Sequence, residues 1–172
     1  MGEKIKKRLK NKNLKEHEVL DGIKKQLPFF SKLNENIQSI FDYAFSEMLN
    51  NAIEHSHSKF IEVEVKKQEN TLIFTVSDSG IGAFKSVMEK HKLKSELEAI
   101  QDILKGKTTT EPRAHSGEGI FFTSKASDIF VLDSHNLRLR VDNLANDIFI
   151  QEIPKKRGTK VKFYVNTSSK KH

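Results

Sequence analysis

The stretch that decides the fold is residues 37–55, IQSIFDYAFSEMLNNAIEH, in which apolar side chains recur at steps of three and four residues. This spacing predicts a long amphipathic helix whose apolar face packs on a core. On the same helix, Glu47, Asn51 and His55 follow one another at intervals of four residues, so their side chains form a polar row beside the apolar stripe. Such a row is either a solvated helix face or the wall of a binding site.

After this helix the pattern changes to the alternation that is typical of strands. Residues 60–65 and 72–76 predict a hairpin closed by a turn at 68–70. Helical spacing returns at 83–105, and residues 120–126 predict a buried helix. The strands expected after it are 129–132, 137–141, 148–153 and 159–165. Because helices and antiparallel strands do not alternate strictly, we expect an α+β fold, a two-layer α/β sandwich whose mixed, mostly antiparallel sheet is covered on one face by helices.

The composition is that of a globular protein. The 172 residues are 36% apolar and 31% charged, which suits one principal domain. No apolar run approaches the roughly 20 residues that span a bilayer, and the N-terminus does not have the pattern of a secretory signal, so we expect a cytoplasmic location. The absence of cysteine excludes disulfides, thiolate zinc sites and cysteine nucleophiles.

The net charge of +7 is concentrated near the two ends of the chain. We therefore expect the domain to occupy 19–166, with a basic arm or the remnant of a preceding module at 1–18 and a disordered tail at 167–172. Solvated tails account for most of the charge. Nucleic-acid binding through the basic N-terminal arm is the alternative interpretation, although no recognition motif accompanies it.

Two short glycine motifs follow the long helix. Asp78-Ser79-Gly80-Ile81-Gly82 ends the second strand of the hairpin, and its glycines permit a close backbone approach. The Asp78 carboxylate either caps its own turn or accepts a hydrogen bond from an exocyclic amine. Gly117-Glu118-Gly119 precedes the apolar helix, where free N–H groups at the helix start suit phosphate oxygens. Each motif alone is also compatible with a purely structural turn.

The order of these motifs resembles the GHKL superfamily of histidine-kinase-like ATPases, which share the Bergerat ATP-binding fold. The resemblance covers residues 31–165. The corresponding segments are Glu47–Asn51 as the N box, Asp78–Gly82 as the G1 box, 83–116 as a helical ATP lid, Gly117–Gly119 as the G2 box and Gly158-Thr159 as the terminal Gly-Thr pair. Within the superfamily, Glu47–His55 looks most like the histidine-kinase and anti-sigma-factor kinase branch.

The resemblance implies a site for ATP and Mg²⁺ and a role for each matching residue. Asn51 would hold Mg²⁺ against the phosphates, and Glu47 would be the general base. Asp78 would accept from the adenine amino group, supported by Thr159 through its hydroxyl or a water. The glycines and serine expected around the nucleotide are Gly80 and Gly82 at the adenine floor and Ser116, Gly117 and Gly119 at the phosphates.

For four further side chains, the sequence leaves open whether they have a role at the nucleotide. His55 either reaches the phosphate side or satisfies its ring nitrogens locally. Lys105, Lys107 and Thr108 belong to the expected lid, where they contact the terminal phosphate or remain solvated.

Three functions agree with these motifs. The first is transfer of phosphate from ATP to a protein partner, as in anti-sigma-type kinases. The second is ATP hydrolysis coupled to lid closure, and the third is a non-catalytic ATP-gated binding module. The Glu47 carboxylate favours a catalytic function, because a non-catalytic pocket does not need it. Autophosphorylation as in a sensor kinase is not expected, since His17-Glu18 is not followed by the proline of a phosphoacceptor helix.

Overall fold

The computed structural model describes residues 3–105 and 115–168, without the side chains of 115–118. One seven-stranded sheet is accompanied by five α-helices and a short 3-10 helix, η1 (Pro28–Lys32). The strands are β1 (Lys4–Lys10), β2 (Phe60–Gln68), β3 (Thr71–Asp78), β4 (Ile129–Ser134), β5 (Leu137–Asp142), β6 (Asp147–Glu152) and β7 (Thr159–Asn166). The helices are α1 (Glu16–Gln26), α2 (Glu35–His55), α3 (Ala83–His91), α4 (Glu96–Lys105) and α5 (His115–Ala126).

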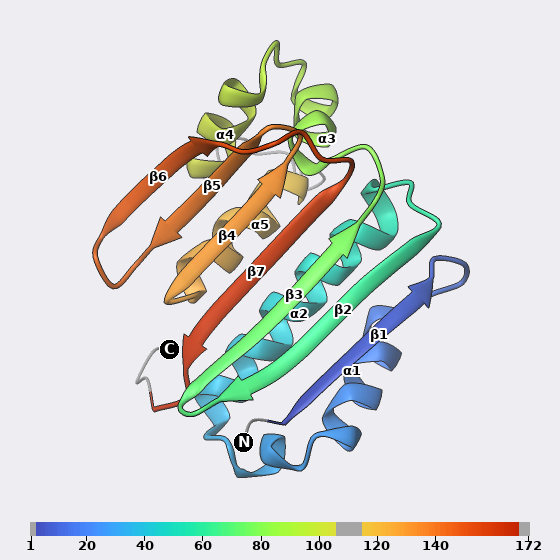
Figure 1. Cartoon of the computed structure of the whole chain (residues 1–172), viewed down its shortest axis with the longest axis vertical. Coiled ribbons are helices and arrows are strands. Elements are labelled where there is room, and N and C mark those ends of the chain that lie inside the picture. Colours follow the sequence, from blue (N-terminus) through green and yellow to red (C-terminus); the bar gives the residue numbers. More distant parts are fainter. Residues whose placement is uncertain (1–2, 106–114, 169–172) are drawn as a thin grey trace.

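The sheet has the strand order β1-β2-β3-β7-β4-β5-β6. Its last strand in sequence, β7, lies in the middle, between β3 and β4 (Figure 1). Each described pairing is antiparallel, so the mixed sheet expected from the sequence is wrong in this detail. The α+β prediction is confirmed.

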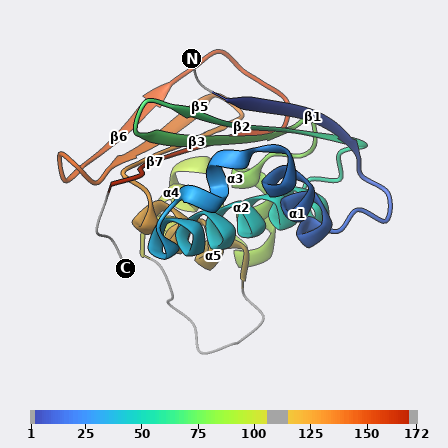
Figure 2. The same cartoon turned by 90° about the horizontal axis from the view of Figure 1, so that it is seen from below.

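The helices lie together on one side of the sheet, and the other side is open (Figure 2). This arrangement gives two layers, as the sequence predicts. The burial pattern of the strands follows from it: in β2, the side chains of Ile61, Val63 and Val65 are buried, while those between them are wholly or partly exposed. An alternating strand with one face on helices and one in solvent is expected to bury every second side chain.

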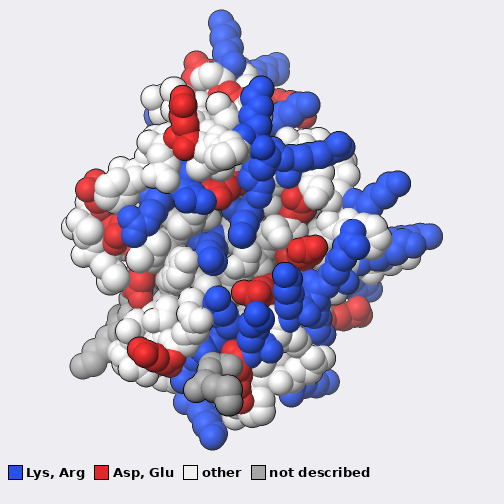
Figure 3. All heavy atoms as spheres, in the orientation of Figure 1, with Lys and Arg blue, Asp and Glu red and all other residues white. Residues whose placement is uncertain are grey.

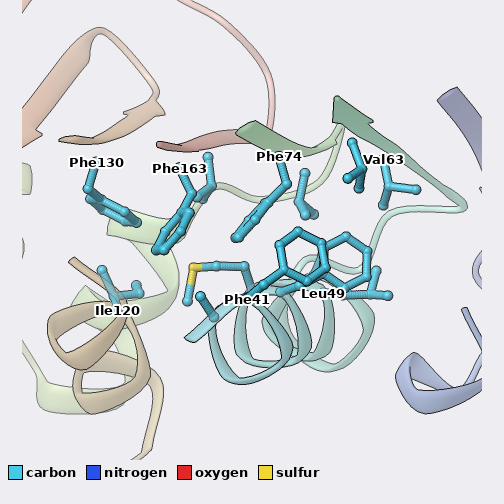
Figure 4. Packing of buried hydrophobic residues seen from close by; sticks show 14 of the residues in the cluster. Phe41, Leu49, Val63, Phe74, Ile120, Phe130 and Phe163 are labelled. Atoms are coloured by element: carbon cyan, nitrogen blue, oxygen red, sulfur yellow. The ribbon is translucent and has the colours of Figure 1, made fainter. Parts of the chain in front are cut away.

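The long helix α2 fixes the core. It begins after Asn34, whose side chain accepts a hydrogen bond from the Ile37 N–H at 2.9 Å and so caps the helix. Its apolar stripe is buried as the spacing predicts, and it meets β3 through aromatic rings (Figure 4). The Phe74 and Phe163 rings stack at 4.8 Å, and Phe74 meets Phe41 and Phe45 edge to face at 5.7 and 5.4 Å.

The N-terminal segment differs from the expected arm. Residues 4–10 form β1, which pairs along its whole length with β2 at the edge of the sheet. Ile5 and Leu9 on the helix-facing side of β1 pack against the core. The basic segment is therefore integrated in the sheet, with the cations of Lys4, Lys6, Arg8 and Lys10 exposed.

The helical segment at 83–105 is divided into α3 and α4. Lys92 adopts a left-handed conformation with φ 55° and ends α3, which is a common way for a helix to stop. Across residues 3–105 and 115–168, no helix is long and apolar enough to cross a membrane.

The aromatic core yields a stability prediction. We expect Phe74→Ala to lower the free energy of unfolding by about 3–5 kcal/mol, because it removes a fully buried ring that contacts three others. Urea denaturation followed by circular dichroism measures this. Leu144→Ala is the control, since Leu144 is 73% exposed and its truncation should change stability by less than about 0.5 kcal/mol. Equal effects of the two substitutions would contradict the assigned core.

Candidate functional site

A pocket lies between α2 and the ends of the central strands. It is lined from α2 by Asn51 and His55, from β3 by Asp78 and from β7 by Thr159. Gly82 and the first residues of α3 close one side. The structure thus brings to one lining five residues that the sequence identified as candidates at separate places along the chain.

Most of the remaining lining is apolar. Met48 and Ala52 come from α2, and Val87 comes from α3. The other apolar side chains at the pocket are Ala83, Val76, Ile120, Leu132 and Val161. These residues carry no motif of their own, because each belongs to the apolar pattern of its own helix or strand. A narrow apolar slot with a few polar groups is the usual form of a pocket for a flat heterocycle.

Asp78 supplies a carboxylate to this slot. Its Oδ1 accepts a hydrogen bond from the Gly80 N–H at 2.9 Å. Burial raises the pKa of Asp78 above its ordinary value of 3.8, while backbone N–H groups of Gly80 and Thr159 and the nearby Lys156 cation act in the opposite direction. A carboxylate held in this way is an acceptor for a ligand donor, such as an exocyclic amine, within a mostly apolar wall.

Thr159 supports Asp78 through its backbone. The Thr159 hydroxyl accepts a hydrogen bond from the Ala83 N–H at 2.7 Å, at the start of α3. The expected support of the Asp78 contact through the hydroxyl or a water stays a prediction. Thr159 therefore joins β7, β3 and α3 at the pocket, since its backbone faces Asp78 and its side chain holds the helix.

The two glycines after Asp78 have different surroundings. A Cβ at Gly80 would overlap the carbonyl of Ser56, the residue that ends α2, and the next residue, Ile81, donates its N–H to the same carbonyl at 2.9 Å. Gly82 has φ +95° and lines the pocket. The sequence motif is thus used in two ways: Gly80 allows the loop to lie against α2, and Gly82 allows it to turn into α3.

Glu47 and Gly119 meet beside the pocket. A Cβ on Gly119 would lie 2.5 Å from the Glu47 Oε2 and 4.0 Å from the Asn51 Nδ2. The backbone of α5 therefore lies directly against the polar row of α2, and any side chain at 119 would displace the Glu47 carboxylate. This places a helix N-terminus, which favours anions, next to a carboxylate and an amide.

The start of α5 differs from the prediction. The helix begins at His115, so Ser116, Gly117 and Gly119 belong to its first turns instead of preceding it. Lys107 and Thr108 lie outside the described residues. Lys105 is exposed at the end of α4.

His55 lines the pocket and also an adjoining hollow with Lys90. Burial is the main reason why the pKa of His55 is lowered from 6.5, and the Lys90 cation lowers it further, against the opposing effect of Glu54. At neutral pH, His55 is therefore an uncharged imidazole. Its Nε2 lies 3.8 Å from the Glu54 Oε2.

The contact of Gly80 with Ser56 yields a second prediction. We expect Gly80→Ala to lower the free energy of unfolding by about 1–3 kcal/mol, because the new methyl group meets a backbone carbonyl that cannot move aside. The control is Gly22→Ala in α1, where the nearest atom is the flexible Lys7 Nζ at 3.7 Å and a gain of about 0.5–1 kcal/mol is expected. Chemical denaturation measures both. A Gly80→Ala protein as stable as the wild type would show that the loop does not lie on α2.

Comparison with known families agrees with this geometry. The model of a family described as histidine kinase-, DNA gyrase B- and HSP90-like ATPases matches residues 37–169. A search among curated proteins returned no match. The matched range starts in the first turn of α2 and contains β7, and so includes all the pocket residues described above. The chain therefore belongs to the GHKL superfamily of histidine kinase-, DNA gyrase B- and HSP90-like ATPases, and it is an ATP-binding domain of this type.

Proposed function

We propose that this domain binds ATP with its adenine in the apolar slot and transfers the terminal phosphate to a hydroxyl group of a protein partner. The observation that carries the proposal is the meeting of Asn51, Asp78 and Thr159 at one pocket. Asp78 would accept from the adenine amino group, and the apolar side chains would enclose the ring. We further propose that the domain works in the cytoplasm, where ATP is supplied.

The phosphate side of the nucleotide would lie toward Glu47, Asn51 and the start of α5. Asn51 supplies an amide oxygen and Glu47 a carboxylate, and both face Gly119. Among the described residues there is no cluster of three or more histidine and acidic side chains that would hold a metal alone. This fits Mg²⁺ in a nucleotide site, because Mg²⁺ keeps several waters and takes most other ligands from the phosphates. When bound, Mg²⁺ would neutralise phosphate charge, and Asn51 would hold it.

Glu47 would act on the attacking group. Its carboxylate would take the proton of the acceptor hydroxyl as the new oxygen–phosphorus bond forms. The bond between the γ-phosphorus and the bridging oxygen then breaks, and ADP leaves. The backbone N–H groups at the start of α5 would contact the phosphate oxygens and so stabilise the negative charge that develops on them. Each of these groups belongs to α2 or α5.

ATP hydrolysis is the second candidate, because Glu47 would act on water in the same way as on a hydroxyl. Its support is the contribution of α3 to the pocket through Ala83, Ser86 and Val87. A nucleotide in the slot would touch α3 directly, and α3 leads through Lys92 into α4. A nucleotide bound in the slot would thereby influence the positions of both α3 and α4.

One experiment separates these functions. The purified protein is incubated with Mg²⁺ and γ-labelled ATP, alone and with a cell extract, and free phosphate and labelled proteins are measured. A second labelled protein supports phosphotransfer, and free phosphate alone supports hydrolysis. If ATP binds but neither free phosphate nor a labelled protein is formed, the domain is a non-catalytic ATP-gated module and the proposal is overturned.

Asp78→Asn is expected to abolish ATP binding without destabilising the fold. The substitution replaces the acceptor of the adenine amine by a group of the same shape. Because burial raises the pKa of Asp78, the charged form destabilises the folded chain, so a neutral amide should leave the melting temperature equal or higher. Calorimetry measures binding, and thermal unfolding in the absence of nucleotide measures stability. Asp147→Asn, at an exposed carboxylate of β6, is the control and should change neither.

The stability difference between Asp78→Asn and the wild type should depend on pH. A raised folded pKa means that the folded chain binds the Asp78 proton more tightly than the unfolded chain does. Stability associated with Asp78 therefore falls as pH rises from 3.8 through the raised value. The difference in melting temperature between Asp78→Asn and the wild type should be largest above that pH range. It should disappear as the pH falls through the range. A gap that widens at acid pH would contradict the burial of an ionised Asp78.

Glu47→Gln is expected to retain ATP binding and to lower turnover by about a hundredfold or more, the usual contribution of a general base. The amide keeps the size of the side chain beside Gly119 but does not take a proton at neutral pH. Glu54→Gln, at an exposed position of the same helix, is the matched control and should keep full turnover. If Glu47→Gln turned over as fast as Glu54→Gln, the general base would have to be another residue.

A further inference from the structure

The open face of the sheet carries an ordered set of charged side chains. Antiparallel pairing aligns residues of successive strands into rows that cross the sheet. The first row, from β1 to β6, is Lys6, Glu64, Thr75, Lys162, Val131, Arg140 and Phe149. The second is Arg8, Glu62, Ser77, Lys160, Asp133, Arg138 and Gln151. Each row thus has a cation on β1, a lysine on β7 and an arginine on β5.

Most carboxylates of this face are engaged with cations of the same face. Asp133 binds Arg138 through two hydrogen bonds of 2.7 and 2.9 Å. Asp142 lies 3.3 Å from the Arg140 guanidinium, and Glu64 lies 3.9 Å from Lys4 and 3.8 Å from Lys66. In the described part of the chain, no ion pair occupies the ammonium groups of Lys6, Lys160 and Lys162. The face is therefore predominantly basic, as its surface shows (Figure 3).

The centre of this face is hollowed. Thr75 and Ser77 of β3 are short, and longer side chains stand on both sides of them. The hollow is lined by Lys160 and Lys162 from β7, by Glu62 and Glu64 from β2, and by Lys6 from β1. Two hydroxyl groups beside two ammonium groups form a suitable place for phosphate oxygens on the β7 side.

Aromatic rings lie on the same face, each beside a cation. The Arg8 guanidinium lies 4.1 Å from the centre of the Phe60 ring, and the Arg140 guanidinium lies 5.4 Å from that of Phe149. Lys162 lies 5.9 Å from the Tyr164 ring. Phe60 and Phe149 are each 40% exposed. Exposed rings and guanidinium planes between cations are the combination on which single-stranded bases stack.

We propose that this open face, from β1 to β6, binds single-stranded nucleic acid. Six strand spacings of about 4.8 Å give a width of about 29 Å for the face, enough for several nucleotides. The lysines of β1 and β7 contact phosphates, and Phe60, Tyr164 and Phe149 offer stacking surfaces. An acidic protein segment would use the same cations but has no use for the rings. The inference does not depend on phosphate transfer, because this face lies on the opposite side of the sheet from the nucleotide pocket.

The test uses the whole chain and a fluorescently labelled 12-nucleotide single strand, with anisotropy measured at several salt concentrations. We expect Lys6→Ala combined with Lys162→Ala to weaken binding at least tenfold and to reduce the salt dependence, since two phosphate contacts are lost. The matched control combines Lys25→Ala and Lys85→Ala, which remove the same charge from exposed positions of α1 and α3. The control should stay within about twofold of the wild type.

Phe60→Leu separates nucleic acid from an acidic protein. Loss of a stacking ring should weaken binding of the single strand about fivefold or more, while binding of a glutamate-rich peptide should not change. Calorimetry with ATP checks that each variant retains the fold and the separate nucleotide site. The proposal would be overturned if the two lysine pairs weakened binding equally, or if no binding occurred at low salt. It would also be overturned if a duplex bound more tightly than the single strand, or if a glutamate-rich peptide competed equally with it.

Discussion

One backbone hydrogen bond, from the Ile81 N–H to the Ser56 carbonyl, holds the two sides of the nucleotide site together. Ser56 ends α2, which carries Glu47 and Asn51, and Ile81 belongs to the loop that follows Asp78. A second link runs from the Ser79 N–H to the Ser58 Oγ at 3.1 Å. Both links require the loop to lie on the end of α2, and Gly80 makes this approach possible by having no Cβ. The distance between Asp78 and the side chains of Glu47 and Asn51 is thus set by how α2 ends.

The elements with strong periodicity were predictable from the sequence, and the confirmed ones include α2 and the hairpin of β2 and β3. β1 was missed, because the helix-facing side of KIKKRLK has Lys7 between Ile5 and Leu9, and only pairing with β2 makes this segment a strand. The early start of α5 was missed for a related reason. Glycine has a low helix propensity, and the first turns of α5 are held against Glu47 and Asn51, which are distant in sequence.

The candidate site was predictable as a set of residues but not as a set of contacts. The resemblance of the ordered motifs to the GHKL superfamily implied that Asn51, Asp78 and Thr159 meet at one site, and all three line one pocket. It did not show that Gly80 faces a backbone carbonyl or that the Thr159 hydroxyl holds the start of α3, since both contacts join segments far apart in the chain. The burial of Asp78 was likewise not predictable from the sequence. Its surroundings raise the pKa, so the fold retains a carboxylate whose charged form costs stability, as is common where a group serves binding.

The two faces of the sheet use alternate residues of the same strands. In β3, Val76 lines the nucleotide pocket, while Thr75 and Ser77 line the hollow on the open face. In β7, Thr159 and Val161 face the pocket, and Lys160 and Lys162 face outward. Because side chains of a strand alternate between faces, a ligand on one face contacts none of the side chains that bind on the other. Influence between them has to pass through the backbones of β3 and β7, which are fixed on both sides by neighbouring strands. Two strands fixed in this way keep the open face and the pocket separate, while α2, α3 and α5 contact the pocket directly.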